Sequence, residues 1–366
     1  MARRLLRVVV IGGLGNFGAR ISRRLSQEAA LEVIATSRQA QGANGIGTAK
    51  VATLDTGDGD FAESIKRLKP DLVIHCAGPF QGQDYRVALA SLACGANYID
   101  LSDGREFVAG FVEAVGPAAR AAGRFAITGA STLPALSSAV VDYLKNFFAY
   151  MHAIDIIIAP GQQAPRGIAT MTAVLGYAGK PFPWWEDGAW RLAHGWQELK
   201  RERFSFGSRL AAACDVPDLE LLPSRYPEVK TVAFRAALEV PVQHLGLWLL
   251  AQAKRMGAPL PIARWARSLN RVGDWLSRFG GRTGGMRVRI RGEDFAGREV
   301  VKTWELIAED NHGPEIPCMA AVLLAIRSSR EGLPSGARVC MGMLVLKDFD
   351  AEFARWHIRT QISPSA

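Results

Sequence analysis

The chain has few cysteines, no close cysteine pair and no long apolar run. Its five cysteines are an odd, widely spaced set, which argues against a disulfide framework and against a zinc site. We therefore expect no metal site and a reducing, cytoplasmic compartment. No apolar run approaches the roughly 18 residues that a membrane-spanning helix needs. Arg7 interrupts the basic N-terminal stretch, which argues against a signal peptide.

Signatures of nucleic-acid binding are also missing. Lys and Arg number 44 against 35 Asp and Glu, which gives a net charge of +9. These charges are dispersed, and no zinc-finger or helix-turn-helix pattern accompanies them, so we expect no nucleic-acid partner. A length of 366 residues suits two domains, and a hydrophobic content of 49 % is typical of folded protein.

The first third of the chain alternates strand-like and helix-like segments. Short apolar runs predict buried strands at 8–11, 31–37, 71–77, 98–101 and 125–128. Helical spacing of apolar residues predicts helices between them, at 18–29, 61–68 and 85–94. This alternation with short connections predicts βαβ units and a doubly wound parallel sheet, the Rossmann form of an α/β fold.

The rhythm changes after about residue 133. A strand at 154–159 and a helix at 167–177 precede a long aromatic and helical middle, and alternating strands follow at 286–290 and 300–308. A helix is expected at 317–328. We therefore predict three parts: a nucleotide-binding domain (1–132), an inserted α+β domain for substrate binding or dimerisation (133–311) and a return segment that packs on the first domain (312–366).

A glycine-rich turn follows the first predicted strand. Gly13, Gly15 and Gly18 form the pattern G-x-G-x-x-G, with Asn16 and Phe17 inside it, directly before a predicted helix. Such glycines permit a tight turn, a close approach of a diphosphate to the backbone and close helix–strand packing. The anion then lies against unpaired N–H groups at the helix N-terminus. The context predicts a dinucleotide site.

The end of the second strand distinguishes NAD from NADP. An NAD enzyme usually has an acidic residue there, but this strand ends with Ser37 and Arg38. Arg38 could bind a 2′-phosphate, which favours NADP. Asp55 and the small residues Ala77, Gly78 and Pro79 follow later strands, where an open parallel sheet binds its ligand.

Several segments resemble the saccharopine dehydrogenase-like family. They are DLVIHCAGPF (71–80), CGANYIDLS (94–102), GASTLPALSS (129–138), APRG (164–167), WELIA (304–308) and HGPEIP (312–317). The resemblance implies an NADP-binding Rossmann domain with an inserted α+β domain. It also implies hydride exchange at a carbon–nitrogen bond, with imine as the oxidised form. The glycine turn, Ser37–Arg38, Asp55 and Ala77–Pro79 lie where that family holds its nucleotide. The residues that grip the carboxyl arms of saccharopine have no match here, so we expect another substrate.

No acid–base pair for catalysis stands out. Candidate residues lie after strands or in turns: Tyr98, Asp100, Arg166 and His312. Asp100 equally suits a turn cap and Arg166 a helix cap. His75, Cys76 and Cys94 lie in apolar stretches and are expected to be packing residues. The tryptophans between 184 and 196 are expected to form aromatic core, with an apolar substrate pocket as the alternative.

An apolar and basic region covers residues 245–271. Leu245–Ala253 is followed by Lys254, Arg255, Arg264, Arg267 and Arg271. A packed helix pair is the favoured interpretation, and peripheral contact with an anionic membrane is the alternative.

The sequence thus predicts an NADP-dependent oxidoreductase that acts on a small-molecule substrate at a carbon–nitrogen or related bond. A non-catalytic NADP-binding scaffold or sensor, peripheral to a membrane, remains the alternative. The sequence leaves a homodimer open.

Overall fold

The computed structural model describes residues 4–39 and 45–364 and divides into two compact units. Unit 1 comprises Met1–Leu136 and Glu315–Leu344, and unit 2 comprises Ser137–Pro314 and Val345–Ala366. The expected return segment 312–366 is therefore shared between the units. Residues 315–344 rejoin unit 1, whereas residues 345–366 belong to unit 2.

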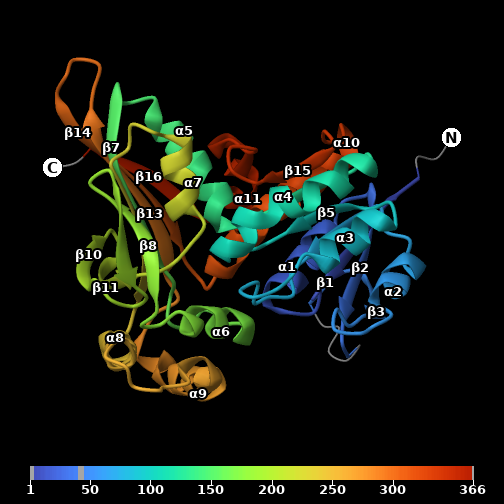
Figure 1. Ribbon diagram of the computed structural model, residues 1–366, viewed down its shortest axis with the longest axis horizontal. Coiled ribbons are helices and arrows are strands. Elements are labelled where there is room, and N and C mark those ends of the chain that lie inside the picture. Colours follow the sequence, from blue (N-terminus) through green and yellow to red (C-terminus); the bar gives the residue numbers. More distant parts are fainter. Residues whose placement is uncertain (1–3, 40–44, 365–366) are drawn as a thin grey trace. The chain divides into compact units, whose positions relative to one another are not determined.

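Unit 1 is built on a seven-stranded parallel sheet with the order β15-β6-β5-β4-β1-β2-β3 among the described residues (Figure 1). Its strands are β1 (Leu6–Ile11), β2 (Leu31–Ser37), β3 (Lys50–Thr53), β4 (Leu72–His75), β5 (Asn97–Asp100), β6 (Phe125–Thr128) and β15 (Gly336–Val339). The order reverses between β1 and β4, so ligands are expected at the carboxyl ends of these strands. The predicted Rossmann fold class is confirmed.

Helices pack on the sheet of unit 1. They are α1 (Asn16–Leu25), α2 (Phe61–Arg67), α3 (Arg86–Ala93), α4 (Arg105–Ala121) and α10 (Ile316–Arg330), with a short π-helical turn η1 (Thr132–Leu136). A buried core joins α2, α3 and α4 to apolar residues of β1, β4 and β5, and α10 packs against α1. Val8, Val9 and Val10 have no exposed surface. This burial on both faces explains their continuous apolar run.

Unit 2 contains a mixed sheet with the order β10-β11-β12-β7-β13-β14-β16, and the β8–β9 hairpin joins it through β12. The strands are β7 (Tyr150–Ala159), β8 (Pro181–Glu186), β9 (Ala189–His194), β10 (Lys200–Phe204), β11 (Gly207–Ala213), β12 (Thr231–Leu238), β13 (Gly284–Glu293), β14 (Glu299–Ala308) and β16 (Arg359–Pro364). The chain's last strand pairs with β14, which explains why residues 345–366 belong to this unit.

The helices of unit 2 are α5 (Ser137–Lys145), α6 (Ile168–Gly176), α7 (Asp218–Arg225), α8 (Pro241–Arg255), α9 (Ala266–Trp275) and α11 (Asp350–Arg355). Helix α5 packs against β13 and β14, and α7 against β12. Met286, Val288 and Ile290 of β13 are buried. Arg287, Arg289 and Arg291 alternate with them along the strand, so these three side chains lie on the opposite face of the sheet.

The prediction of an aromatic and helical middle is correct only for α7, α8 and α9, because its first part forms strands β8 to β11. Trp184, Trp185 and Trp190 lie on β8 and β9, which form an antiparallel hairpin. Aromatic side chains favour strands because they pack well on a pleated surface. Trp184 and Trp196 are buried and belong to the core, as expected, whereas Trp190 is half exposed.

Candidate functional site

The glycine turn lies between β1 and α1, beside the reversal point of the sheet in unit 1. Gly12 has a φ of +73°, a conformation that glycine adopts without strain. The Gly13 amide donates to the carbonyl oxygens of Val10 (3.1 Å) and Thr36 (2.8 Å). The turn is therefore fastened to both β1 and β2 by backbone hydrogen bonds.

Two of the three predicted glycines, Gly13 and Gly18, leave no room for a side chain. A β-carbon at Gly13 would lie 2.7 Å from the Ala35 Cα, and one at Gly18 would overlap the Gly12 carbonyl group. A β-carbon at Gly12 would lie 3.1 Å from the Ala77 backbone nitrogen. Close backbone approach at this turn therefore requires glycine, which is the steric condition for a dinucleotide-binding turn.

The N-terminus of α1 has no side-chain cap. Its N-cap residue is Gly15, which has no side chain to bond the first amides, and the first turn contains no acidic residue. A helix leaves its first N–H groups without intrahelical partners, and its dipole favours an anion there. Asn16, Phe17 and Gly18 begin this helix or lie in its first turn. The arrangement fits a diphosphate.

Three further predicted residues lie at the ends of β2 and β3. Arg38 is exposed and directly follows β2, and the Ser37 hydroxyl accepts a hydrogen bond from the Gln39 amide (3.4 Å). Leu54, after β3, donates its amide to the Ser37 carbonyl (3.0 Å). Asp55 accepts from the Gly57 amide (2.8 Å), which stabilises the turn after β3. The two strand ends are thereby held next to each other.

Ala77, Gly78 and Pro79 form the turn after β4. The side-chain amide of Gln83 donates to the carbonyl oxygens of Ala77 (2.9 Å) and Pro79 (2.7 Å). Ala77 contacts the position that a Gly12 β-carbon would occupy. This turn therefore lies against the glycine turn, at the carboxyl edge of the sheet.

Tyr98 and Asp100 are both fully buried on β5. Asp100 Oδ1 accepts hydrogen bonds from the Ser102 amide, the Gly129 amide and the Thr128 hydroxyl, each at 2.9 Å. The Tyr98 hydroxyl lies 3.0 Å from Nδ1 of His75, which is also buried. Asp100 thus holds together the loops after β5 and β6, and its side chain presents no exposed surface to a substrate.

Burial controls the protonation of this cluster. It raises the pKa of Asp100 to about 6, although the hydrogen bonds from Gly129, Ser102 and Thr128 act in the opposite direction. Burial lowers the pKa of His75 to about 4, so its imidazole is neutral at physiological pH. Burial also raises the pKa of the thiols of Cys76 and Cys94, as expected for packing cysteines.

The other two catalytic candidates lie in unit 2. The Arg166 guanidinium donates to the Gln162 carbonyl oxygen, and Gly167, the next residue, is the N-cap of α6. His312 lies in the turn after β14, where its Nδ1 is 2.8 Å from the Trp356 carbonyl oxygen. Both residues therefore have structural contacts within unit 2.

A small cavity of about 150 Å³ lies on the sheet of unit 2. Six of its lining residues are charged, so it differs from the apolar pocket that was the alternative interpretation of the tryptophans. Arg235 donates to Asp155 at 2.7 Å, and its guanidinium lies 5.3 Å from the centre of the Trp184 ring. Among the described residues, Arg235 Nε and Asp155 Oδ1 are buried without hydrogen-bond partners.

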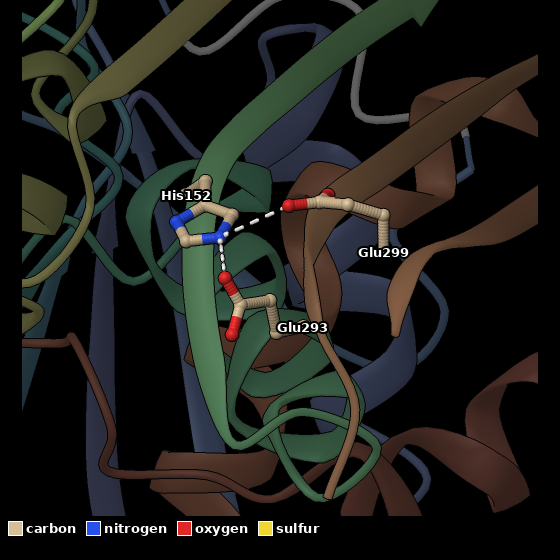
Figure 2. A group of neighbouring side chains, drawn as sticks. All are labelled: His152, Glu293 and Glu299. Atoms are coloured by element: carbon tan, nitrogen blue, oxygen red, sulfur yellow. Dashed lines mark ion pairs between the residues drawn. The ribbon is translucent and has the colours of Figure 1, made fainter. Parts of the chain in front are cut away.

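One group of potential metal ligands occurs in the described part of the chain (Figure 2). His152 Nε2 lies 3.4 Å from an oxygen of Glu293 and 3.4 Å from an oxygen of Glu299. Glu293 and Glu299 are directly opposite each other on β13 and β14, and all three side chains are at least 40 % exposed. An imidazole and two carboxylates could hold a divalent ion, whereas a protonated imidazole pairs with both carboxylates directly.

The sequence did not single out Gly12 or Gln83. Gly12 precedes the motif and is one of two adjacent glycines, so its left-handed backbone was not evident from the spacing. Gln83 acts through backbone carbonyls of the preceding turn, and no sequence pattern predicts that contact.

Comparisons with known proteins agree with this geometry. A family model described as the NAD dependent epimerase/dehydratase family matches residues 8–96, which include the glycine turn and the ends of β2 to β4. No curated protein matches the chain in sequence.

Solved structures match over both units. Saccharopine dehydrogenase (L-Glu forming) from Saccharomyces cerevisiae has a TM-score of 0.67 at 12 % identity, with 99 % of this chain and 100 % of that chain covered. Homospermidine synthase from Legionella pneumophila, in complex with NAD, has a TM-score of 0.63 at 10 % identity (100 % and 93 % covered). An engineered D-amino acid dehydrogenase bound to NADP+ has a TM-score of 0.50 at 17 % identity (95 % and 99 % covered).

The predicted resemblance is therefore confirmed at the level of the fold: along nearly its whole length, this chain has the fold of saccharopine dehydrogenase.

Proposed function

We propose that the chain is an NADP-dependent oxidoreductase that transfers a hydride at a carbon–nitrogen bond of a small substrate. The single observation that carries the proposal is the glycine turn between β1 and α1. Its backbone excludes β-carbons at Gly13 and Gly18, and the α1 N-terminus has no side-chain cap. An anion is the partner that such a turn and helix end accept best.

Each part of the nucleotide has a proposed place in unit 1. The diphosphate lies against Gly13, Gly15 and the first residues of α1, and the adenosine half lies toward Ser37, Arg38 and Asp55. The small residues Ala77–Pro79 leave room for the nicotinamide half. When bound, the nucleotide supplies or accepts the hydride, and the chain's own residues bind and orient it.

The preference for NADP rests on Arg38. Arg38 is exposed and directly follows β2. In an NAD enzyme, an acidic residue at this place usually accepts a hydrogen bond from the ribose 2′-hydroxyl group. Arg38→Asp is expected to weaken NADPH binding about tenfold or more relative to NADH, because one charge-assisted contact is lost and a repulsion is added. Titration of both nucleotides measures the ratio. An unchanged ratio would remove Arg38 from the site, and Arg67→Asp, at an exposed arginine of α2, serves as the surface-charge control.

The carbon–nitrogen chemistry is proposed from the fold. Two neighbours are described as amino-acid-type dehydrogenases, saccharopine dehydrogenase and an NADP+-bound D-amino acid dehydrogenase. Reduction joins a hydride and a proton to an imine and gives an amine. The test is NADPH oxidation, followed by absorbance, with a panel of imines formed from keto acids and amines. Turnover with imines but not with the keto acids alone is the expected result.

A non-catalytic NADP-binding scaffold or sensor is the second candidate. The burial of Tyr98, His75 and Asp100 favours it, because none of these three side chains is exposed at the end of β4 or β5. Tight nucleotide binding without turnover of imines, enoyl compounds or keto acids would support this candidate instead. A cytoplasmic location and a homodimer both stay predictions.

A further inference from the structure

One segment of unit 2 concentrates the chain's positive charge. Residues 241–280, between β12 and β13, contain six Lys and Arg but only one acidic residue, Asp274. The difference is +5, out of +9 for all 366 residues. More than half of the net positive charge therefore lies in this segment, which contains the apolar and basic region identified from the sequence. In Figure 1 the segment forms α8 and α9 at the lower end of unit 2.

Helix α8 exposes an apolar stripe. Val242, Leu245, Leu249 and the C-cap Met256 follow one another at intervals of three, four and seven residues, which places them on one helix face. They are 65, 40, 59 and 73 % exposed. The opposite face of α8 buries His244 and Ala251 and packs against β11 and β12. The exposed stripe therefore belongs to a helix that is already anchored.

The second helix repeats this arrangement. Val272, Trp275 and Phe279, from α9 and the following 3-10 turn η3 (Leu276–Phe279), again have the three-and-four spacing. They are 50, 60 and 63 % exposed. The prediction of packed helices therefore describes only one face of each helix. Each helix buries that face and leaves an apolar face exposed to solvent.

The side chain of Gln162 forms hydrogen bonds with both helices. The Gln162 amide donates to Gln243 of α8 (2.8 Å) and to the Gly273 carbonyl of α9 (3.1 Å). Gln162 is buried, and α9 also packs against α6. Both apolar faces are therefore fixed on unit 2.

Arginines flank the apolar stripe of the second helix. Arg264, Arg267, Arg271 and Arg278 are exposed and follow one another at intervals of three, four and seven residues, and Arg271 and Arg278 directly precede Val272 and Phe279. Within residues 4–39 and 45–364, none of them forms an ion pair with a carboxylate. The Arg278 guanidinium lies 4.3 Å from the centre of the Trp275 ring. These cations are free to meet external anions.

We propose that α8 and α9 dock unit 2 onto the surface of an anionic lipid bilayer. Exposed aliphatic side chains, Trp275 and Phe279 enter the interface between headgroups and acyl chains, and the flanking arginines bind lipid phosphates. Such a combination of an apolar stripe, interfacial aromatics and basic residues matches the chemistry of a bilayer interface. This docking does not depend on the proposed oxidoreductase activity.

The charge pattern favours a bilayer over a second copy of the chain. Two identical surfaces would bring the four unpaired arginines of each copy together, whereas anionic headgroups neutralise them. No helix within the described residues has the length and apolar character to cross a bilayer. The proposed contact is therefore peripheral.

The test is flotation of the full chain with vesicles. One set contains phosphatidylcholine alone, and the other contains about one third phosphatidylglycerol. We expect the protein to float with the anionic vesicles and to remain in solution with the neutral ones. Binding should fall as salt is raised, because the ions screen the arginines.

Two variants separate the contributions to docking. Trp275→Ser with Phe279→Ser should reduce binding at least tenfold, and replacing Arg267, Arg271 and Arg278 with Gln should cost about fivefold for each arginine. The control is Leu192→Ser with Phe295→Ser. These two side chains lie outside this segment and are 72 and 77 % exposed, so the control should bind normally. Unchanged melting temperatures show that the variants are folded.

Each alternative outcome overturns the proposal. It fails if no vesicle binds, if neutral vesicles bind equally well, or if the control loses as much binding as the Trp275 and Phe279 variant. The surface would instead be assigned to a second copy of the chain if the protein binds no vesicles but dimerises in solution, and if Trp275→Ser with Phe279→Ser abolishes the dimer.

Discussion

At Gly13 and Gly18 the absence of a β-carbon determines what the turn can do. These positions were predicted from their spacing together with their context, because a strand, a tight turn and a helix in this order impose their own requirement for glycine. The buried state of Tyr98 and Asp100 was not predictable in the same way. Their position on a predicted strand is local information, whereas their burial depends on α3, α4 and the loop after β6, which pack there from other parts of the sequence.

At the residue scale, we predict that the burial of Asp100 makes the free energy of unfolding depend on pH. Its folded pKa is raised to about 6 from an ordinary 3.8, so between these values the folded state holds a proton that the unfolded state has released. Stability therefore falls as pH rises through this window, by an amount on the order of 3 kcal/mol. Asp100→Asn should remove that fall, because an amide keeps Oδ1 as an acceptor and does not ionise.

Urea unfolding of the wild type and of Asp100→Asn at about pH 4 and about pH 7 measures this effect. The free energy of unfolding of the variant, relative to the wild type, should be higher at the upper pH than at the lower one. Parallel pH dependence of the two proteins would contradict the raised pKa of Asp100.

At the scale of elements, the strands of unit 1 followed from their apolar runs. Strands buried on both faces carry a strong local signal, and β2 and β6 have the predicted bounds. The strands of unit 2 were harder to predict. The β8–β9 hairpin contains Pro181, Pro183 and three tryptophans, and its single backbone pairing with β12 comes from a distant part of the chain.

The ion pair between β7 and β12 provides the prediction at this scale. Arg235 is 5 % exposed and donates to Asp155 at 2.7 Å. Arg235→Met is expected to lower the free energy of unfolding by about 3 kcal/mol, because it leaves a largely buried carboxylate without its cation. The double variant Asp155→Leu with Arg235→Met should regain most of that loss. Urea denaturation of both variants checks this, and equal losses would show that the pair itself is not the cause.

At the scale of the whole molecule, the chain crosses between its two units three times, at Leu136, Pro314 and Leu344. The insertion was predicted from the change of rhythm near residue 133. The last crossing was not, because residues 359–363 of β16 are exposed and give no burial pattern, so that the strand is identified only by its pairing with β14.

The place of the last 22 residues gives a further prediction. Phe349, just before α11, is fully buried and stacks on Phe353 at 5.9 Å. Phe349→Ala should lower the free energy of unfolding by about 3 kcal/mol through loss of burial and a new cavity. Phe295→Ala, at a side chain that is 77 % exposed, should change it by less than about 0.5 kcal/mol. Similar thermal unfolding of the two variants would show that this segment does not belong to the core of unit 2.

The central claim is that the turn from Gly12 to Gly18 binds a nicotinamide nucleotide. Calorimetric titration of the full chain with NADPH tests it most directly. We expect saturable binding by the wild type and by Gly59→Ala, whose β-carbon would meet nothing within 4 Å. Gly18→Ala, whose β-carbon would overlap the Gly12 carbonyl group, should lose that binding. Absence of heat with both NADPH and NADH for the wild type, or full binding by a folded Gly18→Ala, would contradict the claim.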